Sequence, residues 1–187
     1  MTVLELLDRR SVPAKQLDAP GPDAATLQRI LTCAVRVPDH GKRVPFRFIR
    51  IQGDARAALG KQLAAFTLAD EPDAADSAVE KNRNRFTHAP LVIAVVAAQG
   101  PDEKIPASER FSTASCVCLL LLQAAQAEGF GAQWLTGWPA YDARVHGLLG
   151  LAEDEAIAGF IHIGTPRLDA PERERPDPHA LLTDLVL

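Results

Sequence analysis

The chain has 187 residues, 47% of them hydrophobic, and its formal net charge at pH 7 is −4. A folded chain of this length buries about 70% of its unfolded surface, so we expect residues 1–187 to form a single domain that needs no disulfide or metal for stability. The acidic balance argues against broad electrostatic binding to nucleic acid, and it makes any local cluster of basic residues more informative.

The cysteines and the hydrophobic runs indicate in which environment the protein folds and whether it crosses a membrane. Three cysteines and no signal peptide at the N-terminus predict a protein of the reducing cytoplasm, without a disulfide framework. Cys116 and Cys118 lie two residues apart in a helical pattern, so they point in different directions, and we expect both to be small core residues. The longest apolar run, CVCLLLL, is too short to span a bilayer, so no membrane association is expected.

The first two predicted helices are marked by their ends. A capping box near the N-terminus predicts a helix from Val3 that stops before Pro13. A second helix follows Asp23, which can cap it, and its apolar residues recur with the i, i+3, i+4 spacing of an amphipathic face. Pro38 ends this helix and leaves an exposed loop, RVPDHGKRVP, at residues 36–45.

The next segments alternate between strand and helix patterns. FRFIRI at 46–51 predicts a short strand, and residues 54–66 predict a helix capped by Asp54. Residues 70–85 are polar, first acidic and then basic, and we expect a mobile surface excursion there. PLVIAVVAA at 90–98 is a continuous β-branched run, which indicates a central strand buried on both faces.

The second half contains the longest predicted helix, residues 108–128, which is apolar almost all round. It therefore lies inside the molecule or between two subunits. A strand and turn at 132–137, a helix at 142–149 and a strand at 157–164 follow. The ending, residues 179–187, is unusually apolar for a terminus, so we expect it to pack on something, such as a second copy of the chain. This order of elements predicts an α+β fold.

Common catalytic motifs are absent from the sequence. The five histidines show no metal-binding HExxH spacing, and neither a nucleophile elbow nor a phosphate-binding GK[ST] loop occurs. The glycines at 129 and 131 follow a predicted helix instead of opening one, so they do not form a dinucleotide-binding fingerprint.

Three short stretches remain as functional candidates: RRS at 9–11, RVPDHGK at 36–42 and WLTG at 134–137. Each has a structural alternative. The two arginines of the first can complement a helix dipole. The second can be an ordinary turn, and the tryptophan of the third can be a plain core residue.

Together and in this order, the stretches resemble the FMN-dependent nitroreductase family, and in particular its compact bacterial members. The shared pattern is RRS, then R-x-PDH, then a P-[WF] dipeptide leading into a strand, then GFG-x-x-W-x-[ST]-G. The resemblance extends to residues 81–97 and 159–168 and covers nearly the whole chain. It implies a mixed β-sheet core surrounded by helices and an intertwined homodimer with two FMN sites at the subunit interface.

The resemblance also implies the residues that contact the cofactor. They are Arg9, Arg10 and Ser11 of one chain, Arg36 and His40 of the partner chain, and Trp134, Leu135, Thr136 and Gly137 along the flavin ring. In the family, residues matching 124–129 are associated with the nicotinamide nucleotide, but here they read AAQAEG and carry nothing chemically distinctive.

Elementary chemistry supports these assignments. Arginine binds a phosphate dianion through charge-assisted, bidentate hydrogen bonds, and a backbone N–H after Trp134 can reach flavin N5. A cation near N1 and O2 stabilises reduced flavin. Many family members place a basic residue two positions after the serine, where this chain has Pro13, so that contact can shift to Lys15 or Arg10. The familiar Gln-Pro-Trp is here Val-Pro-Phe at 44–46.

The implied activity is a ping-pong oxidoreductase reaction. NADH or NADPH delivers hydride to flavin N5 and leaves, and an electron-poor small molecule, such as a nitroaromatic or a quinone, is then reduced in the same space. His40 is expected to contact the phosphate or ribityl chain, although its titration range also suits a proton donor. The alternatives are an FMN-binding carrier or sensor with little turnover, and a purely structural dimeric module.

Overall fold

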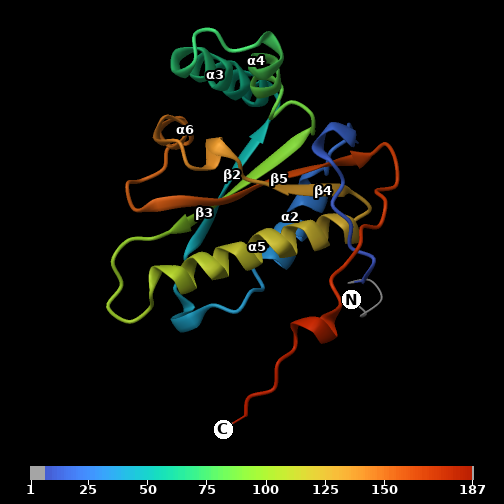
Figure 1. Cartoon of the computed structure of the whole chain (residues 1–187), viewed down its shortest axis with the longest axis vertical. Coiled ribbons are helices and arrows are strands. Elements are labelled where there is room, and N and C mark those ends of the chain that lie inside the picture. The colour runs from blue at the N-terminus through green and yellow to red at the C-terminus, as the bar shows by residue number, and fades with distance from the viewer. Residues whose placement is uncertain (1–6, 187) are drawn as a thin grey trace.

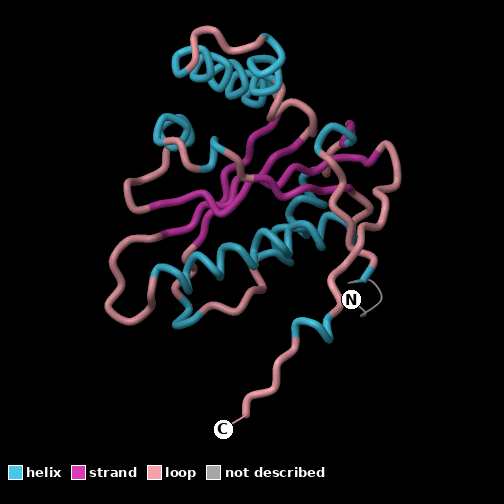
Figure 2. The backbone as a smooth tube through the Cα atoms, in the orientation of Figure 1, coloured by secondary structure: helices cyan, strands magenta, loops and turns pink. Residues whose placement is uncertain are grey.

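An antiparallel sheet of five strands forms the centre of the structure, a computed structural model that describes residues 7–186 (Figures 1 and 2). The strands are β1 (Leu17–Asp18), β2 (Phe46–Gln52), β3 (Leu91–Ala98), β4 (Gly131–Leu135) and β5 (Glu155–Pro166). Their order is β1-β5-β3-β2, and β4 also pairs with the long strand β5. Every one of these pairings is antiparallel.

Helices cover both faces of the sheet (Figure 1). The helices are α2 (Ala24–Ala34), α3 (Asp54–Asp70), α4 (Asp76–Arg83), α5 (Ala107–Ala127) and α6 (Ala143–Leu149). Side chains of α2 and α5 pack into one hydrophobic cluster with the sheet, and side chains of α3 and α6 pack into another on the opposite face. Short 3-10 turns complete the described chain: η1 (Ala14–Gln16), η2 (His40–Lys42), η3 (Trp138–Ala140) and η4 (Pro178–Leu181). The predicted α+β fold is confirmed.

Strand β3 is the central strand that its sequence predicts. Its first seven residues are buried, and successive side chains enter opposite clusters because strand residues alternate between faces. Ile93 and Val95 pack towards α5, whereas Val92 and Val96 pack on the side of α3. An uninterrupted β-branched run is therefore the sequence signature of a strand covered on both sides.

Two predictions about helix ends have different outcomes. Asp23 caps α2 as expected, because its side chain accepts a hydrogen bond from the backbone N–H of Thr26. The predicted cap at Asp54 is wrong by one position: Gly53, at φ 59°, is the N-cap, and Asp54 is the first residue of α3. A positive φ suits glycine, and an acidic side chain in the first turn still favours the helix dipole.

The polar segment 70–85 differs most from its prediction. Instead of an excursion, it contains α4, which packs against α3. Gly60 of α3 permits the close approach, because a Cβ there would collide with the backbone carbonyl of Arg83. Phe86, directly after α4, is fully buried and anchors the segment in the core.

The helix predicted from Val3 begins outside the described residues. Within them, residues 9–13 form no helix. The prediction that both cysteines of α5 are core residues is half wrong: Cys118 is buried, which raises the pKa of its thiol to about 12, but Cys116 is exposed. Cys116 shares the outer face of α5 with Ser112 and Leu119, so that face stays uncovered in one chain.

The C-terminal segment leaves the body of the molecule (Figure 1). From the end of η4 onwards it carries four apolar side chains that are 72–88% exposed: Leu181, Leu182, Leu185 and Val186. Exposing so much apolar surface on a chain end is unfavourable in a monomer. That this segment packs on another surface therefore stays a prediction, and its exposure supports it. Within residues 7–186, no helix has both the length and the apolar character needed to cross a membrane.

Candidate functional site

The segment that carries the first candidate stretch lies beside strand β4. The backbone N–H of Val12 donates to the carbonyl of Ala132 at 3.0 Å, and the N–H of Ala14 donates to Oε1 of Gln133 at 2.6 Å. Residues 12–14 therefore lie beside residues 132–133 of β4. The RRS stretch directly precedes this contact in the chain and the WLTG stretch directly follows it, so the two stretches flank the same short part of β4.

Gln126, near the end of α5, fixes the backbone that presents the arginines. Its Nε2 donates to the carbonyl of Asp8 at 3.1 Å, and its Oε1 accepts from the N–H of Arg10 at 3.0 Å. The amide satisfies one acceptor and one donor on the same short segment. Gln126 belongs to the AAQAEG stretch, so that stretch does carry a positioning residue, which its sequence alone did not reveal.

Four guanidinium groups gather at this end of the site. Nη1 of Arg9 donates to Oγ of Ser11 at 3.2 Å, and Nη1 of Arg10 lies 2.6 Å from Oε2 of Glu172. Burial lowers the pKa of Arg9, and the nearby charges of Arg175 and Arg173 lower it further. Glu172, which also pairs with Arg175 at 2.8 Å, offsets only part of the repulsion between these cations, since the pKa of Arg9 is still lowered.

Arg173 and Arg175 were missed by the sequence analysis. They belong to a charged, proline-rich stretch that is exposed and has the composition of a connector. Only the return of the chain past residue 9 shows that their charges act on Arg9.

At the far end of β4, Trp134 is mainly a packing residue. Its indole Nε1–H donates to the carbonyl of Ala158 at 3.1 Å, and its ring packs against the cluster on the α5 face. Gly159 makes this possible, because a Cβ there would overlap the indole. Leu135 projects to the opposite face, since neighbouring strand residues alternate.

The turn after β4 offers free backbone donors. Gly137 is exposed and adopts φ 71° and ψ −175°, a conformation that residues with a Cβ avoid. Within residues 7–186, the N–H groups of Thr136 and Gly137 donate to no protein acceptor. Such donors fit a ligand acceptor like flavin N5, and the absent side chain of Gly137 permits close approach.

Arg36 and His40 lie elsewhere in the chain. Both are exposed, and Nδ1 of His40 is 2.7 Å from Oε2 of Glu109, in the first turn of α5. Gln126 stands 17 positions further along this helix, about 26 Å away at 1.5 Å per residue. The structure therefore separates the RVPDHGK stretch from the RRS stretch, and a site that uses both needs residues from two chains.

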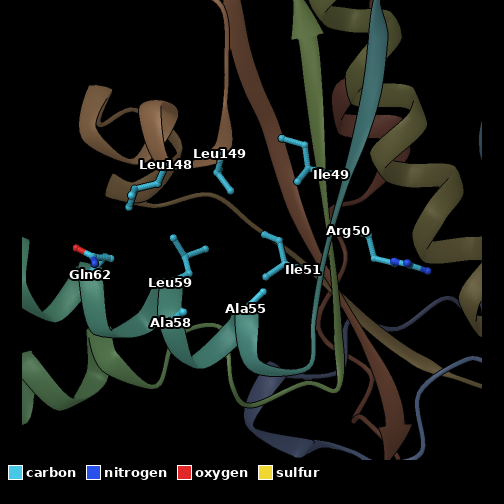
Figure 3. Close-up of a pocket in the computed structure, with 9 residues that line it drawn as sticks. All are labelled: Ile49, Arg50, Ile51, Ala55, Ala58, Leu59, Gln62, Leu148 and Leu149. Carbon is cyan, nitrogen blue, oxygen red and sulfur yellow. The ribbon is translucent and has the colours of Figure 1, made fainter.

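Two open grooves mark the surface. One, of about 380 Å³, adjoins the clustered cations and is lined by Arg10, Val12, Gln126, Gly131 and Leu168 among others. The other, of about 400 Å³, lies between β2, α3 and α6, and its one charged residue, Arg50, points away from it (Figure 3). Only the first groove contains a residue predicted to contact the cofactor, Arg10. Residues 7–186 hold no cluster of three acidic, histidine or cysteine side chains suited to a metal ion.

Comparison with known proteins places this chain in a family. The family profile described as "Nitroreductase family" matches residues 6–165. "Putative NAD(P)H nitroreductase YdjA" of Escherichia coli K12 is 37% identical over 185 residues, which is 98% of this chain and 99% of that protein.

Solved structures show the same fold. The nitroreductase-like family protein of Bacillus cereus superposes with a TM-score of 0.81 at 20% identity, covering 100% of this chain and 96% of that one. A "putative nitroreductase" of Desulfovibrio desulfuricans, crystallised in complex with FMN, superposes with a TM-score of 0.74 at 21% identity, covering 98% of this chain and 96% of that one. With the profile spanning most of its length, the chain belongs to the nitroreductase family of oxidoreductases.

Proposed function

We propose that this chain is an FMN-dependent oxidoreductase that passes hydride from NADH or NADPH, through the flavin, to an electron-poor acceptor such as a nitroaromatic or a quinone. The observation that carries the proposal is the group of guanidiniums around Arg9, whose mutual repulsion an anionic cofactor would relieve. The name of the E. coli relative and the FMN bound by the D. desulfuricans protein support it.

The residues of the site fit the two ends of FMN. Arg9, Arg10 and Ser11 would hold the phosphate together with Arg173 and Arg175, since guanidinium groups bind phosphate oxygens through charge-assisted hydrogen bonds. Glu172 neutralises part of this charge in the absence of a ligand.

The turn after β4 would hold the ring. The N–H groups of Thr136 and Gly137 are available as donors, and Trp134 fixes the strand that presents them. When bound, FMN supplies the reversible uptake of two electrons and a proton. The protein then has to bind, orient and polarise the reactants, so it needs no nucleophile or acid–base pair of its own.

A second copy of the chain would complete the site. His40 lies about 26 Å along α5 from the RRS segment, so we assign it, together with Arg36 of the same loop, to the partner's half of each FMN site. The uncovered face of α5, with Leu119, and the apolar C-terminal segment supply the surface for the dimer.

The proposal is tested by an absorbance spectrum of the purified protein followed by anaerobic titration with NADH and then NADPH. The expected result is a yellow protein that oxidises one of these cofactors steadily when a nitroaromatic is present. Flavin binding without steady turnover would identify a carrier or sensor instead. A colourless protein whose melting temperature does not respond to FMN would refute the proposal.

The dimer has its own test. Replacing Leu181 and Leu185 by aspartate should raise the dimer dissociation constant at least tenfold, because each leucine loses about 1.5–3 kcal/mol of apolar burial. FMN affinity should fall with it. Sedimentation of the double variant at several concentrations measures the effect, and Leu148→Asp, at a 48% exposed position of α6, is the matched control. Unchanged association would contradict the assignment of this segment to the interface.

A further inference from the structure

Arg85 lies against the turn that we assign to the flavin ring. It follows α4 in the chain, and its Nη1 is 3.1 Å from the position that a Cβ of Gly137 would take. Because Gly137 is exposed and has no side chain, the guanidinium borders the space beside the turn. The sequence predicted no role for this residue, although it lies in the 81–97 stretch that takes part in the family resemblance.

The charge of Arg85 has no protein counter-ion in the described chain. Its Nη2 donates to the neutral Oδ1 of Asn82 at 3.3 Å, and its Nε is buried without any hydrogen-bond partner. Arg83, two residues earlier, is exposed and pairs with Glu80 at 2.7 Å. A half-buried cation without a carboxylate is costly to the fold, and burial lowers the pKa of Arg85.

Asn82 holds the guanidinium in place. Its Oδ1 also accepts from the indole Nε1 of Trp138, at 3.1 Å, and Trp138 directly follows Gly137. One amide oxygen therefore accepts from both the guanidinium of Arg85 and the indole of Trp138, and this holds Arg85 beside the turn. This is the arrangement expected for a fixed cation that meets a ligand at the turn.

Among the titratable groups described near this turn, Arg85 is the one that is both charged and partly buried. Burial lowers the pKa of His162 to about 4, and burial followed by the charge of Lys15 lowers the pKa of His88. Both imidazoles are therefore neutral at pH 7. Lys15 is charged but exposed, so water screens it.

We infer that Arg85 is the cation that stabilises the negative charge gained by the flavin ring on reduction, in place of the basic residue that Pro13 excludes from the usual position. This inference rests on the proposed FMN function. Transfer of hydride from NAD(P)H moves two electrons and one proton to the ring and releases NAD(P)⁺, so the ring gains one unit of negative charge. A nearby desolvated guanidinium favours that product electrostatically.

The test compares wild type with Arg85→Gln and Arg85→Met, two neutral variants of which either suffices if the other does not fold. Reductive titration of the FMN-loaded protein against a reference dye gives the midpoint potential, and flavin fluorescence gives the affinity for oxidised FMN. We expect each variant to lose at least tenfold of its preference for reduced over oxidised flavin, a fall of about 30 mV for a two-electron couple. Affinity for oxidised FMN should change much less.

Two controls sharpen the comparison. Arg83→Gln removes an exposed, paired arginine two residues away and should leave the potential unchanged. Arg85→Lys keeps the charge and should stay closer to wild type than either neutral variant does.

The remaining outcomes are distinguishable. Variants that bind FMN with the wild-type potential overturn the role of Arg85 and leave the proposed function intact. A raised KM for NAD(P)H at unchanged potential also overturns it, because it places Arg85 on the nicotinamide nucleotide. Wild-type protein that does not bind FMN at all refutes the proposed function, and the inference with it.

Discussion

Replacing Arg9 by alanine should weaken FMN binding roughly ten- to hundredfold while leaving the FMN-free protein at least as stable as wild type. The loss corresponds to about 1.5–3 kcal/mol for a charge-assisted hydrogen bond to phosphate. The second half of the prediction follows from the surroundings of Arg9: burial and the charges of Arg175 and Arg173 already disfavour its charged form when no ligand is present. Fluorescence titration with FMN and thermal melts with and without FMN measure the two effects.

Two further variants calibrate this result. Arg29→Ala removes an exposed arginine that pairs with Glu128, close to the end of α5, and should change neither affinity nor FMN-dependent stabilisation. Arg10→Ala should have a smaller effect than Arg9→Ala, because Glu172 already neutralises part of the charge of Arg10. An Arg9→Ala protein with wild-type FMN affinity would show that Arg9 is only a surface charge.

Local sequence patterns predicted the elements whose burial follows from their own residues. The i, i+3, i+4 spacing in α2 and the β-branched run of β3 each state which faces are covered, and Leu27, Ile30 and Val92 are buried accordingly. The RRS and WLTG stretches were found because a motif spans only a few adjacent residues. Their proximity across β4 depends on the hydrogen bond from Val12 to Ala132, which no local pattern encodes.

The elements that the sequence did not reveal depend on contacts between distant segments. Helix α4 carries one buried residue, Val79, so its own pattern is polar, and its place comes from the close approach at Gly60 of α3. Arg85 resembles the other basic residues around it until the position of Gly137 is known. The effect of Arg173 on Arg9 likewise depends on the fold, because the chain returns past Arg9 only in the folded structure.

Packing between distant segments also buries His162, and this burial should lower the stability of the folded protein in acid. This histidine of β5 is 1% exposed, its Nδ1 is buried without a hydrogen-bond partner, and its ring stacks on Phe86 at 5.8 Å between centroids. Burial, and then the nearby His88 and Arg85, lower its pKa from 6.5 to about 4. The folded state therefore keeps this imidazole neutral over a pH range in which the unfolded state protonates it.

The resulting loss of stability has a defined direction and window. Because the folded pKa is the lower one, the unfolded state binds more protons between pH 6.5 and 4, so stability is full above this range and falls as the pH drops through it. Between pH 7 and pH 5 the loss should be about 2 kcal/mol. Urea unfolding of the FMN-free protein at pH 7, 6 and 5 measures it.

His162→Leu should remove most of this pH dependence, whatever its effect on stability at pH 7. His88→Gln should remove a smaller part, because His88 also has a lowered pKa but is only half-buried. Asp142 does not contribute to the change between pH 7 and pH 5. Its pKa is lowered from 3.8 to about 2, so the stability that it contributes is lost only below about pH 3.8. If His162→Leu loses as much stability as wild type between pH 7 and pH 5, the buried imidazole is not the source of the acid sensitivity.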